Sequence, residues 1–243
     1  MISKERLLEI GKNKGLKNKE HIEKDYFQDI FLFNLYKKTN LFIFKGGTAL
    51  YKLYNLPRFS EDLDFSSLED SGKTEEIIKE VIASVNSFSI RSLKKIHDSL
   101  LIKISVEGIL TDYNTLRIDI NLKNKPLKEA DIKNLIPEYI DISPFSLQVL
   151  KVDEIISEKI HALLTRRKAR DLYDLFFLLR MAKLDKKLAE EKLKLFGMKY
   201  DLDLIKNRIS ALKNIWAYEL KPFVLSDLPE FSLVKDFVAS KLE

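Results

Sequence analysis

The sequence predicts an α/β (α+β) fold with a mixed β-sheet, followed by a helical C-terminal region. The first observation is a short apolar run at 41–44 that leads into a glycine pair and then into helical periodicity. The second is a set of segments that alternate like half-buried strands, near 61–66, 89–96, 100–107 and 115–122. The third is that no Gly or Pro occurs from Phe145 through Phe196. We therefore expect two domains, at 1–150 and 151–243.

Helical periodicity accounts for most of the remaining chain. Residues 3–39 are predicted to form two helices, with apolar residues such as Ile22 and Tyr26 at helical spacing. The helix after the glycine pair should end near Pro57, because proline and the residue before it disfavour continuation. Residues 74–87 form an amphipathic pattern, and the C-terminal region carries helical segments near 152–182, 186–196, 201–218 and 229–241.

The composition is that of a globular protein without cysteine chemistry. Of the 243 residues 45% are hydrophobic and 33% charged, and no run approaches the ~18 apolar residues of a membrane helix. The absence of Cys excludes disulfides, cysteine-based zinc sites and cysteine nucleophiles. The charged N-terminus does not resemble a secretory signal, so a cytoplasmic location is expected. The net charge of +5 favours an anionic partner only weakly.

The segment 45–66 carries the pattern that indicates chemistry. Gly46 and Gly47 stand together in a chain with only seven glycines, between a predicted strand and a predicted helix. Such a turn directs backbone N–H groups at a phosphate. Asp62 and Asp64 alternate with apolar residues, which places both carboxylates on one strand face about 7 Å apart, as a divalent metal beside a nucleoside triphosphate requires. A phosphate cradle followed by a metal-binding pair indicates nucleotidyl transfer.

Asp119 is the natural third carboxylate for a site with two metal ions. In 116–122 the alternation has no interruption, so Asp119 shares the polar face with Arg117. The alternative is that Asp119 only pairs with Arg117 or with a nearby lysine. Glu107 and Asp112 are competing carboxylates with a weaker claim.

Three segments carry motifs in a specific order and spacing. They are Gly46-Gly47-Thr48, then Arg58-Phe59-Ser60-Glu61-Asp62-Leu63-Asp64-Phe65, then Glu158-Lys159 followed by Arg167 and Arg170-Asp171-Leu172-Tyr173-Asp174-Leu175. Together they resemble the polymerase-β-type nucleotidyltransferases, in particular the AbiEii/AbiGii toxins of type IV abortive-infection and toxin–antitoxin pairs. The resemblance implies a nucleotidyltransferase fold whose helical domain contributes to the active-site cleft.

The resemblance also implies the roles of individual residues. Mg²⁺, or Mn²⁺, would be bound by Asp62, Asp64 and Asp119. The nucleoside triphosphate would be held by Gly46, Gly47, Thr48, Arg58, Ser60 and Lys159. Asp171 and Asp174 would belong to the catalytic set, and the sequence leaves open which of the two acts. The implied acceptor is an RNA hydroxyl, such as the 3′ end of a tRNA, and the implied partner is a cognate antitoxin, with no membrane involved.

Each signal in the C-terminal region also has a plainer interpretation. Lys159 can be an ordinary surface lysine of a helix. Asp171 and Asp174 can form pairs along the helix with Arg167 and Arg170, worth only ~0.3–0.5 kcal/mol each. The basic run 166–170 can be a solvated surface, or it can meet RNA phosphates.

Two other functions compete with nucleotidyl transfer. One is a nucleotide-binding regulatory module without turnover, which would not need three carboxylates. The other is a metal-dependent glycosyltransferase, since Asp-x-Asp also holds nucleotide-sugars, but such sites follow a Rossmann-like half of roughly a hundred residues. Only 61 residues precede Asp62. His21, His97 and His161 show no zinc-like spacing.

Overall fold

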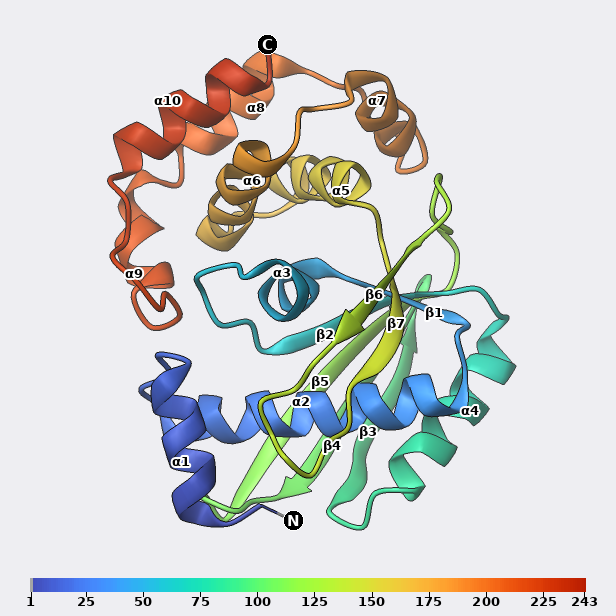
Figure 1. Ribbon diagram of the computed structural model, residues 1–243. Helices are drawn as coiled ribbons and strands as arrows, with labels where there is room; N and C mark the ends of the chain where they lie inside the picture. The colour runs from blue at the N-terminus through green and yellow to red at the C-terminus, as the bar shows by residue number, and fades with distance from the viewer. Residues whose placement is uncertain (1) are drawn as a thin grey trace. The chain divides into compact units, whose positions relative to one another are not determined.

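A computed structural model describes residues 2–243, which form two compact units (Figure 1). The first unit contains the residues up to Asn55 together with Phe59–Lys125 and Ala130–Val149. The second contains Leu56–Arg58, Pro126–Glu129 and Leu150–Glu243. A single boundary near residue 150 does not describe this division, because two short segments join the second unit.

Both short segments are held by buried carboxylates of the second unit. Arg58 binds Asp174 through two hydrogen bonds. Glu154 accepts hydrogen bonds from the backbone N–H groups of Leu127 and Lys128, at 2.9 and 3.2 Å. These interactions join residues far apart in the sequence, so no local pattern indicates them.

The first unit is built around a seven-stranded sheet, counted over the described residues, in the order β3-β4-β5-β2-β1-β7-β6. β2 pairs in parallel with β5, β1 pairs in parallel with β7, and the other pairs are antiparallel, so the sheet is mixed as predicted. Its elements are α1 (Lys4–Asn13), α2 (Lys19–Lys38), β1 (Phe42–Lys45), α3 (Gly46–Tyr54), β2 (Asp62–Ser67), α4 (Ser71–Ala83), β3 (Phe88–Ile96), β4 (Ser99–Glu107), β5 (Tyr113–Asn121), β6 (Asp131–Leu135) and β7 (Phe145–Val149).

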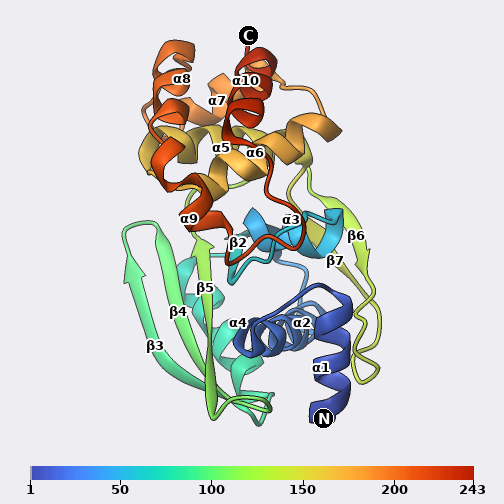
Figure 2. The same cartoon turned by 90° about the vertical axis from the view of Figure 1, so that its left-hand side faces the viewer.

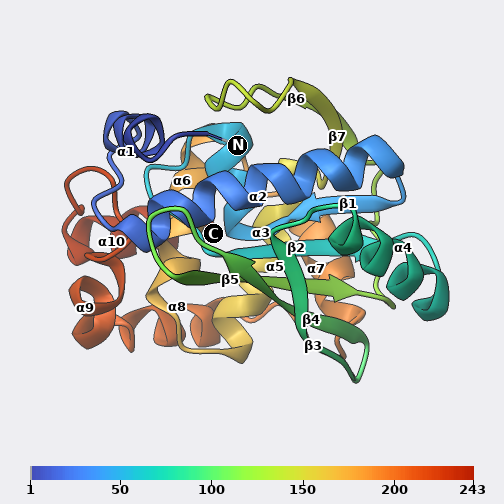
Figure 3. The same ribbon diagram turned by 90° about the horizontal axis from the view of Figure 1, so that it is seen from below.

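Helices α2 and α4 pack together against one face of the sheet, which is the core face (Figure 3). The ring of Phe27 lies 6.0 Å from that of Phe88, and the ring of Phe31 lies 6.4 Å from that of Phe65. On β4 and β5 the inward residues are fully or almost fully buried: Leu100, Ile102, Ile104, Leu116, Ile118 and Ile120. Because side chains alternate along a strand, the residues between these point to the opposite face.

Helix α3 is attached to α2 by a buried charge cluster. Lys52 Nζ lies 2.5 Å from Asp25 Oδ1 and 2.7 Å from Asp29 Oδ1, and Lys14 Nζ lies 2.5 Å from Asp25 Oδ2. Burial opposes ionisation of Asp25, but the two lysines outweigh it and hold the pKa of Asp25 far below its usual value. For Asp29 burial dominates, and its pKa is raised. The cluster fixes the helix that starts at Gly46.

The second unit is helical, as predicted. It contains α5 (Val152–Thr165), α6 (Ala169–Met181), α7 (Lys186–Lys194), α8 (Leu202–Ser210), the 3₁₀ helix η1 (Lys213–Ile215), α9 (Trp216–Leu220) and α10 (Phe231–Lys241). Asp185 and Asp201 cap α7 and α8 by accepting from the backbone N–H groups of Leu188 and Leu204. Over the described residues, the helices are too short or too polar to cross a membrane.

Several elements differ from their predictions. The segment 201–218 is divided into α8, η1 and α9. Strands β6 and β7 were not predicted, because both are only five residues long. The segment 152–182 is two helices, since the chain is extended at Arg166 and Lys168. Helix α4 begins at Ser71, because the Asp70 carboxylate accepts hydrogen bonds from the backbone N–H groups of Gly72 and Lys73.

Candidate active site

The predicted metal ligands lie on one face of two neighbouring strands. In the parallel pair of β2 and β5, Asp64 is opposite Asp119 and Asp62 is opposite Arg117. Partners opposite each other point to the same face, with Cβ atoms roughly 5 Å apart. Asp62, Asp64 and Asp119 are all half-buried. The pairing of β2 with β5 therefore brings together carboxylates that are far apart in the sequence.

The competing carboxylates do not join this group. Glu107 lies at the end of β4 opposite Tyr113, and Asp112 lies in the turn before β5. Asp119 lies six positions after Tyr113 on β5, which corresponds to roughly 20 Å along an extended strand. Neither Glu107 nor Asp112 shares the face position that Asp119 holds beside Asp64.

The chemistry of the donor set fits a hard divalent cation, which prefers carboxylate oxygens. Within residues 2–243, however, no three His, Cys, Asp or Glu side chains gather closely enough to enclose an ion. The metal role of Asp62, Asp64 and Asp119 therefore stays a prediction that rests on their shared face.

The glycine turn lies directly against one of these carboxylates. Gly46 has φ +74°, a conformation that disfavours residues with a side chain, and it is the first residue of α3. A Cβ atom there would lie 2.9 Å from Asp64 Cγ and would overlap the Asp64 carboxylate. Glycine at this position thus lets the backbone at the start of the helix approach Asp64, as a phosphate-binding turn beside a metal ligand requires.

Thr48 and Gln28 hold the backbone at the start of β2. Thr48 is fully buried, and its hydroxyl donates to the carbonyl oxygen of Asp62. Gln28, which is fully buried on α2, donates through Nε2 to the carbonyls of Ser60 and Glu61, at 2.9 Å each. Three consecutive carbonyls are thus each held by a side chain from another element. The Thr48 hydroxyl is engaged with the backbone, so the expected contact of this residue with a phosphate would involve its N–H group.

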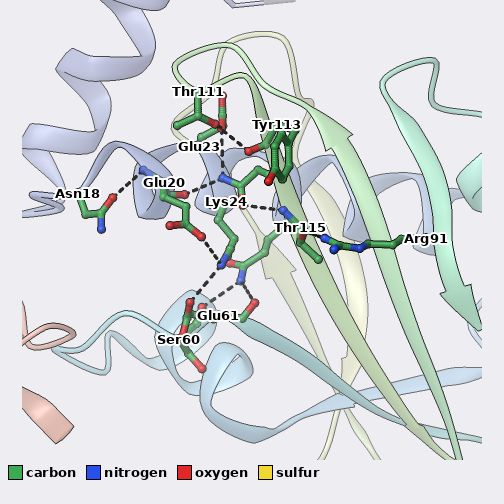
Figure 4. Close-up of polar contacts among 12 residues, drawn as sticks. Asn18, Glu20, Glu23, Lys24, Ser60, Glu61, Arg91, Thr111, Tyr113 and Thr115 are labelled. Atoms are coloured by element: carbon green, nitrogen blue, oxygen red, sulfur yellow. Dashed lines mark hydrogen bonds and ion pairs between the residues drawn. The ribbon is translucent and has the colours of Figure 1, made fainter.

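Lys24 adds a charge contact to the same segment (Figure 4). Its Nζ lies 3.0 Å from Glu61 Oε1, and Figure 4 shows the side chains of α2 reaching toward Ser60 and Glu61. Sequence analysis missed both Lys24 and Gln28. Their only signal was that polar residues interrupt the apolar pattern of a buried helix, which does not name a partner.

In the second unit, the predicted site residues form one buried ion-pair network. Lys159 Nζ lies 2.7 Å from Asp174 Oδ2 and 3.2 Å from Asp171 Oδ1. Arg58 binds Asp174 through Nε and Nη2, both at 2.7 Å, and Arg166 binds Asp171 at 2.7 and 2.8 Å. Lys159 is therefore no ordinary surface lysine, since only 7% of it is exposed.

The network keeps both aspartates ionised. Burial alone would raise the pKa of Asp171, but Lys159 and Arg166 outweigh it and lower the pKa to about 2. Burial also opposes the charge of Asp174, yet Arg58 and Lys159 hold its pKa below the usual value. For Lys159, burial would lower the pKa, whereas Asp174 and Asp171 raise it. Both carboxylates are thus equally engaged with cations.

The alternative pairing along α6 is wrong for the part of the chain that the structure describes. Arg167 donates to the carbonyl of Ala211 at 2.8 Å. The guanidinium of Arg170 lies over the ring of Phe223, 5.1 Å from its centre. Neither arginine pairs with the aspartate four residues later, because the cations at Asp171 and Asp174 come from Arg166, Lys159 and Arg58.

Comparisons with known proteins identify the family of the chain. The family described as "Nucleotidyl transferase AbiEii toxin, Type IV TA system" matches residues 30–233. The structure is similar to MenT4, a nucleotidyltransferase toxin from Mycobacterium tuberculosis H37Rv, with a TM-score of 0.70 and 18% identity over 97% of this chain and 88% of that one. It is also similar to JHP933 from Helicobacter pylori, with a TM-score of 0.54 and 24% identity over 88% of both chains. No curated protein matches. The family match covers most of the sequence, so the chain belongs to the AbiEii nucleotidyltransferase toxins of type IV toxin–antitoxin systems.

Proposed function

We propose that the chain transfers a nucleoside monophosphate from a nucleoside triphosphate to an acceptor hydroxyl, with Mg²⁺ or Mn²⁺ bound by Asp62, Asp64 and Asp119. The observation that carries the proposal is the pairing of β2 with β5, which places these carboxylates on one face, with the Gly46 turn against Asp64. A nucleotide-binding module without turnover would need no such arrangement. Membership of a nucleotidyltransferase family also argues against glycosyl transfer.

Residues of the first unit would bind both the triphosphate and the metal. The backbone N–H groups of Gly46, Gly47 and Thr48, at the start of a nine-residue helix, would bind the triphosphate, aided by Ser60. A bound divalent metal would supply charge neutralisation and a lower pKa for the attacking hydroxyl. Because Gln28 and Thr48 hold the backbone ahead of Asp64, the carboxylates would be oriented before any ligand arrives.

The network of the second unit would supply positive charge. Arg58, Lys159 and Arg166 carry three positive charges against the two negative charges of Asp171 and Asp174, so the network has an excess of one cation. We expect Lys159 to reach the triphosphate or to hold Asp171 and Asp174 in place for catalysis. In either role, its loss would leave two carboxylates buried with fewer cations, which is strongly unfavourable.

We infer further that the acceptor is RNA, with the 3′ end of a tRNA as the first candidate, and that the protein acts as a cytoplasmic toxin restrained by a cognate antitoxin. The family supports the antitoxin and the triphosphate. The exposed basic run 166–168 supports a polyanionic acceptor.

The test is to incubate the protein with total RNA, Mg²⁺ and each labelled nucleoside triphosphate in turn. Asp62→Asn and Asp64→Asn should abolish label transfer and remain folded, whereas Asp98→Asn, an exposed carboxylate in the turn after β3, should transfer normally. Mg²⁺ with a saturating triphosphate should raise the Tm of the wild type by about 5–10 °C and leave both site variants unchanged. Full transfer by Asp62→Asn or Asp64→Asn would refute the metal assignment.

A further inference from the structure

The face of β3, β4 and β5 that points away from the core is continuous with the row of site carboxylates. Figure 2 shows these three strands running side by side. Across the sheet, one row of opposed residues reads Lys94, Leu101, Asp119, Asp64 and Lys45. The next row reads Ser92, Lys103, Arg117 and Asp62. Each row that contains a site carboxylate therefore also contains cations. We call the part of this face around Arg91, Lys103 and Arg117 the strip.

This strip holds cations of like charge directly beside one another. Lys103 on β4 is opposite Arg117 on β5, and both are exposed. Arg91, at the irregular point of β3, reaches across β4 so that its Nη1 lies 3.5 Å from Thr115 Oγ1 on β5 (Figure 4). Like charges opposite each other on a sheet destabilise it. An anion that lies between Arg91, Lys103 and Arg117 would remove this repulsion.

Four other exposed lysines of the first unit have carboxylate partners. Lys38, Lys73, Lys79 and Lys123 form ion pairs with Glu80, Glu76, Glu75 and Asp98, at 2.7 to 3.2 Å. The strip is different, because Lys103 has Arg117 as its cross-strand neighbour. What distinguishes the strip is therefore this cross-strand pair of like charges.

The remaining groups on the strip favour a phosphate backbone over a protein surface. Small hydroxyl side chains lie between the cations, namely Ser89, Ser92, Ser105 and Thr115. Hydroxyls, Arg and Lys are the groups that contact phosphate and sugar oxygens in nucleic-acid complexes. A protein partner would instead be expected to bury a central apolar or aromatic patch, whereas the exposed Ile96 and Tyr113 of this face lie at the end of β3 and at the start of β5, away from its centre.

We propose that the exposed face of β3, β4 and β5 binds the phosphate backbone of a single-stranded nucleic-acid acceptor, with Arg117, Lys103 and Arg91 contacting successive phosphates as the strand leaves the site carboxylates. This inference rests on the proposed nucleotidyl transfer and assigns the acceptor its path. Arg117 lies beside Asp62, so the acceptor terminus would enter at the carboxylates and its backbone would cross the strands toward β3.

The experiment compares two double variants with the same change of charge. Arg91→Gln with Lys103→Gln removes two cations of the strip, and Lys12→Gln with Lys17→Gln removes two exposed lysines elsewhere in the first unit. Binding of a short 5′-fluorescein single-stranded RNA is measured by anisotropy at about 50 to 200 mM salt. No triphosphate or metal is present, so the measurement does not depend on catalysis. All proteins are checked by thermal melting, with and without Mg²⁺ and a triphosphate.

We expect the strip variant to bind the RNA at least tenfold more weakly, and its salt slope to fall by about 1.4, the value for two lost phosphate contacts on a single strand. The control variant should stay within twofold of the wild type. Equal losses in both variants, or no RNA binding by the wild type, would overturn the proposal. RNA affinity retained in full by the strip variant would also overturn it. In all proteins the melting shift with Mg²⁺ and triphosphate should persist, and its absence from the wild type would instead count against nucleotidyl transfer.

Discussion

Replacing Gly46 by alanine tests the close approach between the glycine turn and Asp64. Gly46 and Gly197 both have positive φ, at +74° and +69°, so an alanine is strained at either position. Only at Gly46 does the new Cβ meet other atoms, at 2.9 Å from Asp64 Cγ and closer to its carboxylate oxygen. Around Gly197 nothing lies within 4 Å. Gly197→Ala is therefore a matched control for the backbone strain.

The magnitudes follow from these two environments. The left-handed conformation costs an alanine about 1–2 kcal/mol in either variant. Displacing the Asp64 side chain adds about 1–3 kcal/mol, the usual cost of overpacking, in Gly46→Ala alone. At about 2–4 °C per kcal/mol for a chain of this size, the Tm should fall by about 2–8 °C for Gly197→Ala and further for Gly46→Ala.

Activity separates the two variants more sharply than stability does. The assay is label transfer from a nucleoside triphosphate to RNA, at a temperature well below both Tm values. We expect Gly46→Ala to lose transfer, because Asp64 must turn away from the face that it shares with Asp119. We expect Gly197→Ala to keep it. Equal activity and equal Tm in the two variants would show that the turn does not press against Asp64, and the account of the glycine pair would be wrong.

Two further predictions concern buried polar groups. Gln28→Met keeps the side-chain volume but removes both hydrogen bonds to the Ser60 and Glu61 carbonyls. The free energy of unfolding, measured in urea, should therefore fall by about 2–4 kcal/mol. The rise in Tm on addition of Mg²⁺ and triphosphate should also become smaller. Asn34→Met removes one hydrogen bond within the same helix, so it should lower the free energy of unfolding by less and leave the Tm shift unchanged. A larger loss of stability and of Tm shift in Asn34→Met than in Gln28→Met would contradict the positioning role of Gln28. For Asp171 the folded pKa of about 2 lies below its usual value of 3.8, so its contribution of about 2 kcal/mol is present above pH 4 and is lost as the pH falls toward 2. The stability difference between the wild type and Asp171→Asn should therefore shrink on acidification, and a pH-independent difference would refute the ionised state.

The sequence by itself indicated the features that depend on neighbouring residues. The run 41–44, the glycine pair and the helix after it are local signals, and β1 and α3 follow them. Strict alternation in 116–122 placed Asp119 on a polar strand face, because side chains alternate whatever the strand pairs with. The order of the motifs was specific enough to indicate the family. Short strands such as β6 were missed, since five residues carry little pattern.

Only the tertiary structure decided which of these residues meet. Asp64 lies opposite Asp119 because β2 pairs in parallel with β5, and nothing in either strand alone specifies that register. Arg58 and Asp174 are 116 residues apart, and their ion pair stands in place of the pairing along the helix that the sequence spacing allowed. Gln28 acquired its role from the carbonyls that folding brought to it. Periodicity is a property of adjacent residues, whereas strand register and buried ion pairs depend on the packing of distant segments.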